Sequence, residues 1–308
     1  MRGWKHALLT TYTLSLSYFE SEILQSLLRG GCSDIWLIAD AEGYRSSLLE
    51  RRSMRVGQEY RLIPVALPNG VFHAKCIYLA GDQGDLLLVG SGNVTFGGHG
   101  KSMEVFEALS PEFAASAFRD FADFLEAVGS RPDIKIARSE WVEEFAARAR
   151  LAADGGADQD NSPPVRLVHP VNEPVIDQLA SLLAPHGACT EAVIMSPYHD
   201  RDGFALRELA NRLNVFRTSV AVTKAGASPF PFDQTAAWPH PVSPVKACRK
   251  DKRFVHAKWY EFQTDTRRVL LTGSINATRK ALTTSDNVEL GVLRCIGPRF
   301  DCTIPAAA

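Results

Sequence analysis

The sequence contains the same pair of short motifs twice. The first copy is His73-Ala74-Lys75 followed by Gly90-Ser91-Gly92-Asn93, and the second is His256-Ala257-Lys258 followed by Gly273-Ser274-Ile275-Asn276. In each copy the serine lies 18 positions after the histidine, at 73 and 91 and at 256 and 274. Further on, each copy is followed by an acidic residue in an apolar run, Glu104 and Glu289. Packing alone does not require such a repeat, so it predicts two similar halves that together form one site.

The composition is that of a globular protein without a strong overall charge. The 308 residues are 45% hydrophobic and 22% charged, with a formal net charge of −1, so a polyanionic partner must be attracted by a local basic patch. The six cysteines show no C-x-x-C pair, which is typical of a reducing cytosol rather than a disulfide framework. No signal pattern and no apolar stretch of membrane-spanning length is present. We expect a cytoplasmic protein that uses no membrane, metal or cofactor.

Strands alternate with helices in both halves, which predicts an α/β class. In the first half we expect strands at 7–14, 34–39, 61–67, 71–79 and 85–89, and helices at 18–28 and 111–129. In the second half we expect helices at 175–183 and 204–213, and strands at 191–195, 216–223, 254–262 and 269–272. The predicted fold is two similar βα sandwich lobes, with mixed sheets flanked by helices, related by a pseudo-twofold axis. The lobes are expected at 1–153 and 175–308, joined by a linker at 154–174 whose first part, 154–164, is rich in turn formers and is expected to be exposed.

The first histidine motif lies in a predicted hairpin formed by 71–79 and 85–89. Residues two apart on a strand point to the same face, so His73 and Lys75 are expected to project together. The strand at 254–262 is expected to carry His256 and Lys258 in the same way.

With both motifs in view, the chain resembles the phospholipase D superfamily, whose members carry H-x-K and then G-S-x-N in each of two lobes. The family usually places an aspartate seven positions after the histidine, where this sequence has Ala80 and Gln263. Asp82 and Asp265 lie nine positions after each histidine, and we expect them to be turn residues.

The resemblance implies a metal-independent phosphodiesterase that works through a phosphohistidine. It makes His73 the nucleophile and His256 the general acid, although the sequence alone does not break their near-symmetry. Lys75 and Lys258 would supply positive charge to the phosphoryl oxygens, and the carboxylates of Glu104 and Glu289 would fix the histidine tautomers. Four residues are expected to bind substrate: Ser91, Asn93, Ser274 and Asn276.

The substrate is predicted from a basic run that precedes His256. The basic residues of this run are Lys246, Arg249, Lys250, Lys252 and Arg253; beside a phosphoryl-transfer centre they favour a nuclease that acts on DNA or RNA. Two alternatives stay open, a phospholipid-hydrolysing or phosphatidyl-transferring enzyme and a nucleic-acid-binding module with an inactive site. Three aromatic residues, Phe230, Phe232 and Trp238, could contact a membrane, stack on bases or close a core.

Family analogy further suggests a place in a bacterial defence or restriction system. The partner would be a helicase, ATPase or sensor domain in the same or a neighbouring chain. The sequence stops on Ile304-Pro305-Ala306-Ala307-Ala308, without a capping or packing pattern, and we expect a longer natural protein.

Overall fold

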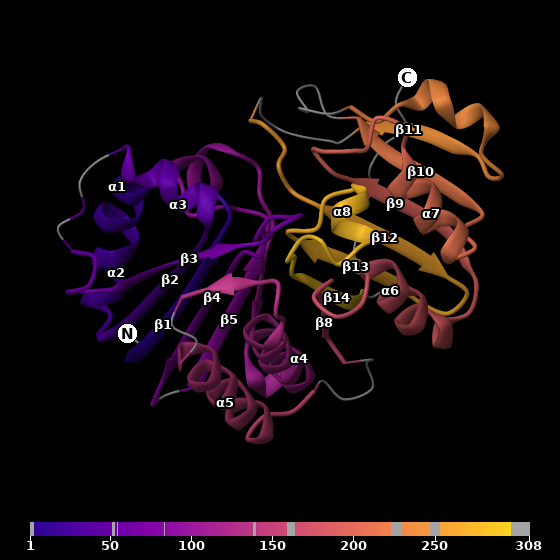
Figure 1. Cartoon of the computed structure of the whole chain (residues 1–308). Coiled ribbons are helices and arrows are strands. Elements are labelled where there is room, and N and C mark those ends of the chain that lie inside the picture. The colour runs from indigo at the N-terminus through magenta and orange to yellow at the C-terminus, as the bar shows by residue number, and fades with distance from the viewer. Residues whose placement is uncertain are drawn as a thin grey trace.

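The computed structural model describes residues 3–50, 53, 55–82, 84–137, 140–158, 164–222, 229–246 and 253–296. They form two lobes, each built on a mixed seven-stranded sheet (Figure 1). The first sheet has the order β6-β5-β4-β1-β2-β3-β7. Its strands are β1 (Trp4–Thr11), β2 (Asp34–Asp40), β3 (Arg61–Ala66), β4 (Cys76–Gly81), β5 (Gly84–Gly90), β6 (Phe106–Leu109) and β7 (Lys135–Ile136).

The second sheet repeats the order of six of these strands. Its order is β11-β10-β9-β12-β13-β14-β8, so that β9 to β14 take the places of β1 to β6. In the first sheet β1, β2 and β3 pair in parallel, and in the second β9, β10 and β11 do so. The next three strands of each repeat, β4 to β6 and β12 to β14, pair antiparallel. The strands are β8 (Arg166–Val168), β9 (Cys189–Met195), β10 (Arg217–Val222), β11 (Val242–Lys246), β12 (Trp259–Thr264), β13 (Arg268–Gly273) and β14 (Gly291–Ile296).

Helices cover both faces of the first sheet because its central strands are apolar on both sides. Leu9 and Leu37 face the core under the first helices, whereas Leu8 and Ile38 face the core under the two long ones. The helical segments of this lobe are α1 (Leu16–Tyr18), η1 (Phe19–Ile23), α2 (Leu24–Arg29), α3 (Ala41–Leu48), η2 (Gly97–Lys101), α4 (Pro111–Ser130) and α5 (Glu140–Asp154). The second lobe has α6 (Val175–Leu183), η3 (Ala184–His186), α7 (Phe204–Arg212), η4 (Phe232–Ala237) and α8 (Arg279–Leu282).

The fold class predicted from the sequence is confirmed. The strands predicted at 71–79 and 254–262, however, begin later than expected. β4 begins at Cys76 and β12 at Trp259, so both H-x-K motifs lie just before their strands. The reason is that the chain there pairs with the other lobe instead of its own sheet. Asp82 and Asp265 do lie in the turns that follow β4 and β12.

Within the predicted linker at 154–174, the first part is largely exposed where the structure describes it, at Asp154, Gly155, Ala157 and Pro164, whereas part of 165–174 is packed. Strand β8 within it pairs antiparallel with β14, and Leu167 and Val171 are buried in a core that also contains residues of both lobes. Apolar side chains at these two positions explain the difference, since they gain from burial against α4 and β14. The exact division of the chain into lobes stays a prediction.

Two of the sequence predictions concern residues outside the described ranges. These are the central residues of the basic run, Arg249, Lys250 and Lys252, and the tail at 304–308. Within the described part of the chain, none of the helices has the length and apolar character needed to cross a membrane.

Candidate active site

The two lobes are joined by two short backbone bridges that are related by the repeat. Phe72, just before His73, bridges Val288, just before Glu289; Val255, just before His256, bridges Met103, just before Glu104. The His73 N–H donates to the Val288 carbonyl at 2.7 Å, and the His256 N–H donates to the Met103 carbonyl at 2.9 Å. Each bridge therefore places a histidine of one lobe beside a glutamate of the other.

His73 is held by the carboxylate of Glu289. Its Nδ1 lies 2.6 Å from Glu289 Oε2, and because a carboxylate only accepts, the proton must sit on Nδ1. Ser274 and Asn287 donate to the same carboxylate, at 2.5 and 3.2 Å. The Glu289 side chain is fully buried. The neutral His73 ring thus keeps its Nε2 lone pair available.

His256 is held in the mirror arrangement by Glu104. Its Nδ1 lies 2.8 and 3.0 Å from the two carboxylate oxygens, and Ser91 donates to the same group at 2.5 Å. The side chain of His256 is 12% exposed and that of His73 is 9% exposed. Both rings therefore reach the surface only through the pocket that they line.

Each of the two lysines is buried beside the histidine of its own motif. Lys75 donates to the carbonyl of His73 at 2.6 Å and Lys258 to the carbonyl of His256 at 2.8 Å. Lys258 Nζ also lies 3.1 Å from His256 Nε2. Both side chains are buried, at 1% and 0% exposure, so their charges act in a low-dielectric environment where they attract an anion strongly.

The serines do not take the substrate-binding role expected for them. Ser91 and Ser274 are 0% exposed, and their hydroxyls donate to Glu104 and Glu289 while accepting from the backbone N–H of Val105 and Leu290 at 3.0 Å. A hydroxyl has one proton, and here it is used on the carboxylate. The serines thus hold the glutamates that hold the histidines.

The two asparagines line the pocket but are not held alike. Asn93 Oδ1 accepts from the backbone N–H groups of Tyr12 and Thr13, both at 3.2 Å, which leaves its NH₂ group for the pocket. In the second lobe Pro197 stands where the first has Tyr12, and proline has no N–H. Among the described residues the buried Asn276 Oδ1 has no hydrogen-bond partner. The two halves of the site are therefore similar but not equivalent.

The pocket that contains both histidines, called here the catalytic pocket for the role proposed below, has a volume of about 520 Å³ and is formed by both lobes. Its lining includes four of the predicted site residues that bear on a ligand directly, His73, Asn93, His256 and Asn276, together with Glu104. Tyr12 also lines the pocket, which its sequence position did not indicate, and its ring centroid lies 5.3 Å from that of His73. Tyr198, which follows a strand end, stands in the same way 6.1 Å from the His256 ring.

Burial and charge set the protonation of the site. Burial lowers the pKa of His73 to about 4, with Lys75 and Lys258 adding to the effect and Glu289 opposing it. Burial likewise lowers the pKa of His256 and lowers that of Lys258 to about 8. Burial alone would raise the pKa of Glu289, but His73, Lys75 and Ser274 outweigh it and the pKa is lowered. A bound phosphate would raise the pKa values of the cations, because its negative charge stabilises them.

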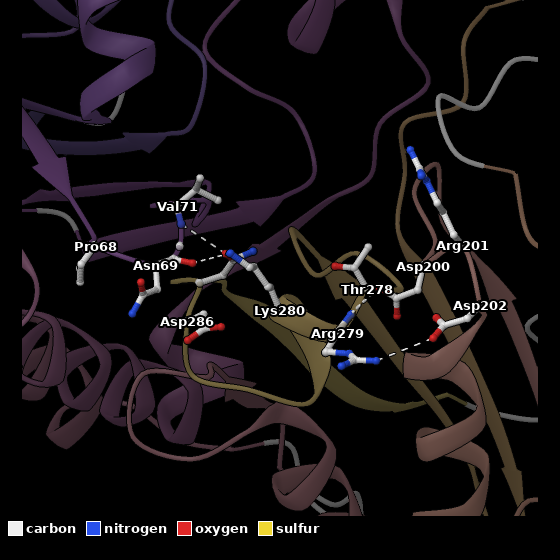
Figure 2. A pocket seen from close by; sticks show the side chains of 12 residues that line it. Pro68, Asn69, Val71, Asp200, Arg201, Asp202, Thr278, Arg279, Lys280 and Asp286 are labelled. Carbon is white, nitrogen blue, oxygen red and sulfur yellow. Dashed lines mark hydrogen bonds and ion pairs between the residues drawn. The ribbon is translucent and has the colours of Figure 1, made fainter.

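Two further pockets adjoin the catalytic pocket and extend it into a groove. One of about 1080 Å³ shares Val71, Thr278 and Asn287 with it. Figure 2 shows this pocket, whose lining contains three cations, Arg201, Arg279 and Lys280, named here the cationic arm, and three aspartates, Asp200, Asp202 and Asp286. Asp202 lies 3.8 Å from Arg279 in the same pocket.

The second adjoining pocket, of about 610 Å³, shares Gly98, Ser102 and Glu104 with the catalytic pocket. Arg253, at the end of the predicted basic run, lines it. Lys246, at the other end of that run, is exposed at the end of β11, the edge strand of the second sheet, and lines none of these three pockets.

The aromatic loop of the second lobe closes a core. Phe230 is 8% exposed and its ring packs against Phe232 and Trp238, with centroids 4.9 and 5.8 Å apart. Of the three roles that the sequence left open for this loop, the structure favours the third.

Among the described residues, His6, Asp34 and Glu144 hold donor atoms close enough to share a metal ion, and none of them lines the catalytic pocket.

Comparison with known proteins supports the fold. No protein-family model matches the sequence, and no curated protein matches it. A structure of a mutant yeast tyrosyl-DNA phosphodiesterase is 13% identical, with a TM-score of 0.59 over 96% of this chain and 83% of that one. Polyphosphate kinase from Porphyromonas gingivalis is 13% identical, with a TM-score of 0.51 over 97% of this chain and 41% of that one.

A third match is Nuc from Salmonella typhimurium, described as a phospholipase D family member. It is 20% identical, with a TM-score of 0.29 over 44% of this chain and 84% of that one. With its two six-strand repeats, this chain shares the fold of the yeast tyrosyl-DNA phosphodiesterase structure.

Proposed function

We propose that the chain is a metal-independent phosphodiesterase that cleaves DNA or RNA through a phosphohistidine intermediate. One observation carries the proposal. Two histidines from different lobes line a single pocket, and each has its Nδ1 held by a glutamate of the opposite lobe. This arrangement leaves the lone pair of His73 Nε2 for attack, and it places His256 Nε2, which lies 3.1 Å from Lys258 Nζ, in the same pocket for proton transfer, as a two-step displacement at phosphorus requires.

In the first step His73 Nε2 attacks phosphorus and the bond to the leaving oxygen breaks. The leaving alkoxide takes a proton from Nε2 of His256, which acts as general acid. Lys75 and Lys258 stabilise the negative charge on the phosphoryl oxygens, the task that a metal ion performs in many other phosphodiesterases. The amide of Asn93, held by the backbone of Tyr12 and Thr13, donates to one of those oxygens.

In the second step a water molecule attacks phosphorus and gives its proton to His256. The bond between phosphorus and His73 breaks, and His73 returns to its neutral form. Glu289 stabilises the positive charge that His73 carries while it is phosphorylated, because it lies 2.6 Å from Nδ1.

A nucleic acid suits the surroundings of the pocket better than a lipid does. The groove extends on both sides of the pocket, with cations at Arg279 and Lys280 on one side and Arg253 on the other, and a nucleic-acid strand carries phosphates to either side of the one that is cut. The yeast protein with the same fold is, by name, a phosphodiesterase of tyrosyl-DNA. The link to a helicase, ATPase or sensor domain in a defence or restriction system stays a prediction from the resemblance.

The function is tested by incubating the protein with labelled single- and double-stranded DNA and RNA in excess EDTA. We expect cleavage that EDTA does not reduce and that the His256→Ala protein lacks. Phospholipid vesicles form a parallel arm. Vesicle hydrolysis without oligonucleotide cleavage would select the lipid enzyme, and tight oligonucleotide binding without any cleavage would select the inactive binding module.

The rate should depend on pH with an acidic optimum. His73 must be unprotonated to attack, and burial lowers its pKa to about 4; His256 must be protonated, and burial lowers its pKa below the ordinary 6.5. We expect kcat/KM to rise above pH 4, to peak below pH 6.5 and then to fall about tenfold per pH unit. Above pH 8 the loss of charge from Lys258 should steepen the fall. Rates measured from pH 4 to 9 that climb through neutrality would contradict this protonation scheme.

A further inference from the structure

The repeat allows the two sides of the catalytic pocket to be compared position by position. Thr95 and Thr278 follow the two asparagines, and the next residue is Phe96 in the first lobe but Arg279 in the second. The cross-strand partner of Gly90 is Phe106, whereas that of the matching Gly273 is Gly291. At both positions the first lobe has a phenylalanine and the second lobe does not.

The Phe106 ring lies directly against the motif loop of the first lobe. A Cβ atom at Gly92 would come within 2.8 Å of Phe106 Cζ, so a glycine is needed there. In the second lobe Ile275 replaces Gly92, and a Cβ atom at Gly291 would come within 2.7 Å of it. Ile275 is 1% exposed, but Phe106 is 39% exposed. A buried aliphatic side chain fills this space in one lobe, and a partly exposed aromatic ring fills it in the other.

Phe106 belongs to a row of four aromatic rings, Tyr18, Phe96, His99 and Phe106, named here the aromatic arm. Tyr18 stands edge-on to Phe96 at 5.1 Å and to His99 at 5.6 Å, and His99 stands edge-on to Phe106 at 5.8 Å between centroids. Phe96 is 59% exposed. Exposed aromatic rings in contact with one another form a surface that flat ligands can cover.

The aromatic arm is continuous with the catalytic pocket. Tyr18, His99 and Phe106 line the pocket of about 610 Å³ that shares Gly98, Ser102 and Glu104 with the catalytic pocket. The cationic arm, with Arg279 at the position equivalent to Phe96, adjoins the catalytic pocket through a different set of residues. One branch of the groove therefore has three cations beside three aspartates, and the other has aromatic rings.

We propose that the aromatic arm is a binding subsite for an unpaired nucleobase next to the scissile phosphate. The inference rests on the proposed function and narrows its substrate to nucleic acid that is single-stranded at the point of cleavage. Every base has a flat face that stacks on an aromatic ring, whereas a paired base inside a duplex has its faces covered by its neighbours. The cationic arm then binds backbone phosphates on the other side of the cut, which gives the strand one preferred direction through the groove.

The test uses short single-stranded DNA oligonucleotides that carry one 2-aminopurine each, at successive positions. They are titrated into His73→Asn protein, which leaves the strand uncut, and quenching of the 2-aminopurine fluorescence reports stacking. We expect strong quenching at one position or two adjacent ones. Phe96→Ala and Phe106→Ala should each raise the Kd about tenfold and reduce the quenching, the range expected for stacking on one ring. Phe106→Tyr should restore both.

Two controls separate stacking from damage to the fold. Phe216→Ala removes an equally large ring that is 74% exposed and lies in the second lobe, outside the aromatic arm, and it should leave the Kd unchanged. A strand that lacks the base at the position where quenching occurs should bind equally well to the His73→Asn protein with and without the Phe96→Ala substitution. Three outcomes would overturn the proposed subsite. They are an equal loss of affinity for abasic and intact strands in the Phe96→Ala protein, an absence of quenching at every position, and binding of a blunt duplex as tight as that of a single strand. Failure of the proposed function gives a different result, namely quenching by the aromatic arm but no cleavage by the wild-type protein.

Discussion

The His73→Ala protein is expected to lose about 10⁴-fold or more in kcat for phosphodiester cleavage, because the attacking atom is gone and no other side chain of the pocket is placed to replace it. The effect should appear in kcat rather than in substrate affinity. Lys75, Lys258 and Asn93, which we propose bind the phosphate in both ground and transition states, remain in place. Single-turnover rates and the Kd for an uncut oligonucleotide, measured on the same preparation, separate the two quantities.

The matched control is His186→Ala, because His186 lies in η3 and lines none of the three pockets of the groove. Its activity should stay within a factor of two of the wild type. Cleavage by His73→Ala at more than a hundredth of the wild-type rate would show that this histidine is not the nucleophile.

The Glu289→Leu protein is expected to be less stable by about 3–5 kcal/mol, the range seen when one partner of a buried charge network is removed. Leucine cannot accept hydrogen bonds, so the donors of His73, Ser274 and Asn287 would be buried without a partner. Lys75, which is 1% exposed, would lose a nearby opposite charge. Urea unfolding followed by circular dichroism measures the change in the free energy of unfolding.

The same substitution at an exposed glutamate calibrates this result. Glu22 lies on η1 with its side chain exposed, and Glu22→Leu should change the stability by no more than about 0.5 kcal/mol. If Glu289→Leu proved as mild as Glu22→Leu, the cross-lobe carboxylate network would not hold the lobes and histidines as described.

The sequence predicted the fold class because the motifs recur at fixed spacing, and it proposed the site residues, five of which line one pocket. It did not predict which glutamate holds which histidine. That pairing depends on the backbone bridges from Phe72 to Val288 and from Val255 to Met103, and contacts between residues so far apart leave no periodic pattern in the chain.

The local errors have a related cause. The apolar residues around Phe72 and Val255 resemble the start of a strand, but their partners are in the other lobe. Strand β11 was missed because Pro244 lies inside it, and proline is tolerated there because β11 is at the edge of the sheet. The aromatic arm was missed because Tyr18 is far in sequence from the other three rings, and only the fold brings them together.

In the proposed reaction His73 carries the phosphoryl group, whereas His256 donates a proton and then accepts one. This division of roles is tested most directly with His256→Ala protein and bis(4-nitrophenyl) phosphate, whose leaving group departs without a proton. We expect a burst of one nitrophenolate per protein molecule, no further turnover, and a phosphoryl adduct that mass spectrometry of the digested protein locates on His73. Continued turnover without a burst, or an adduct on any other residue, would contradict it.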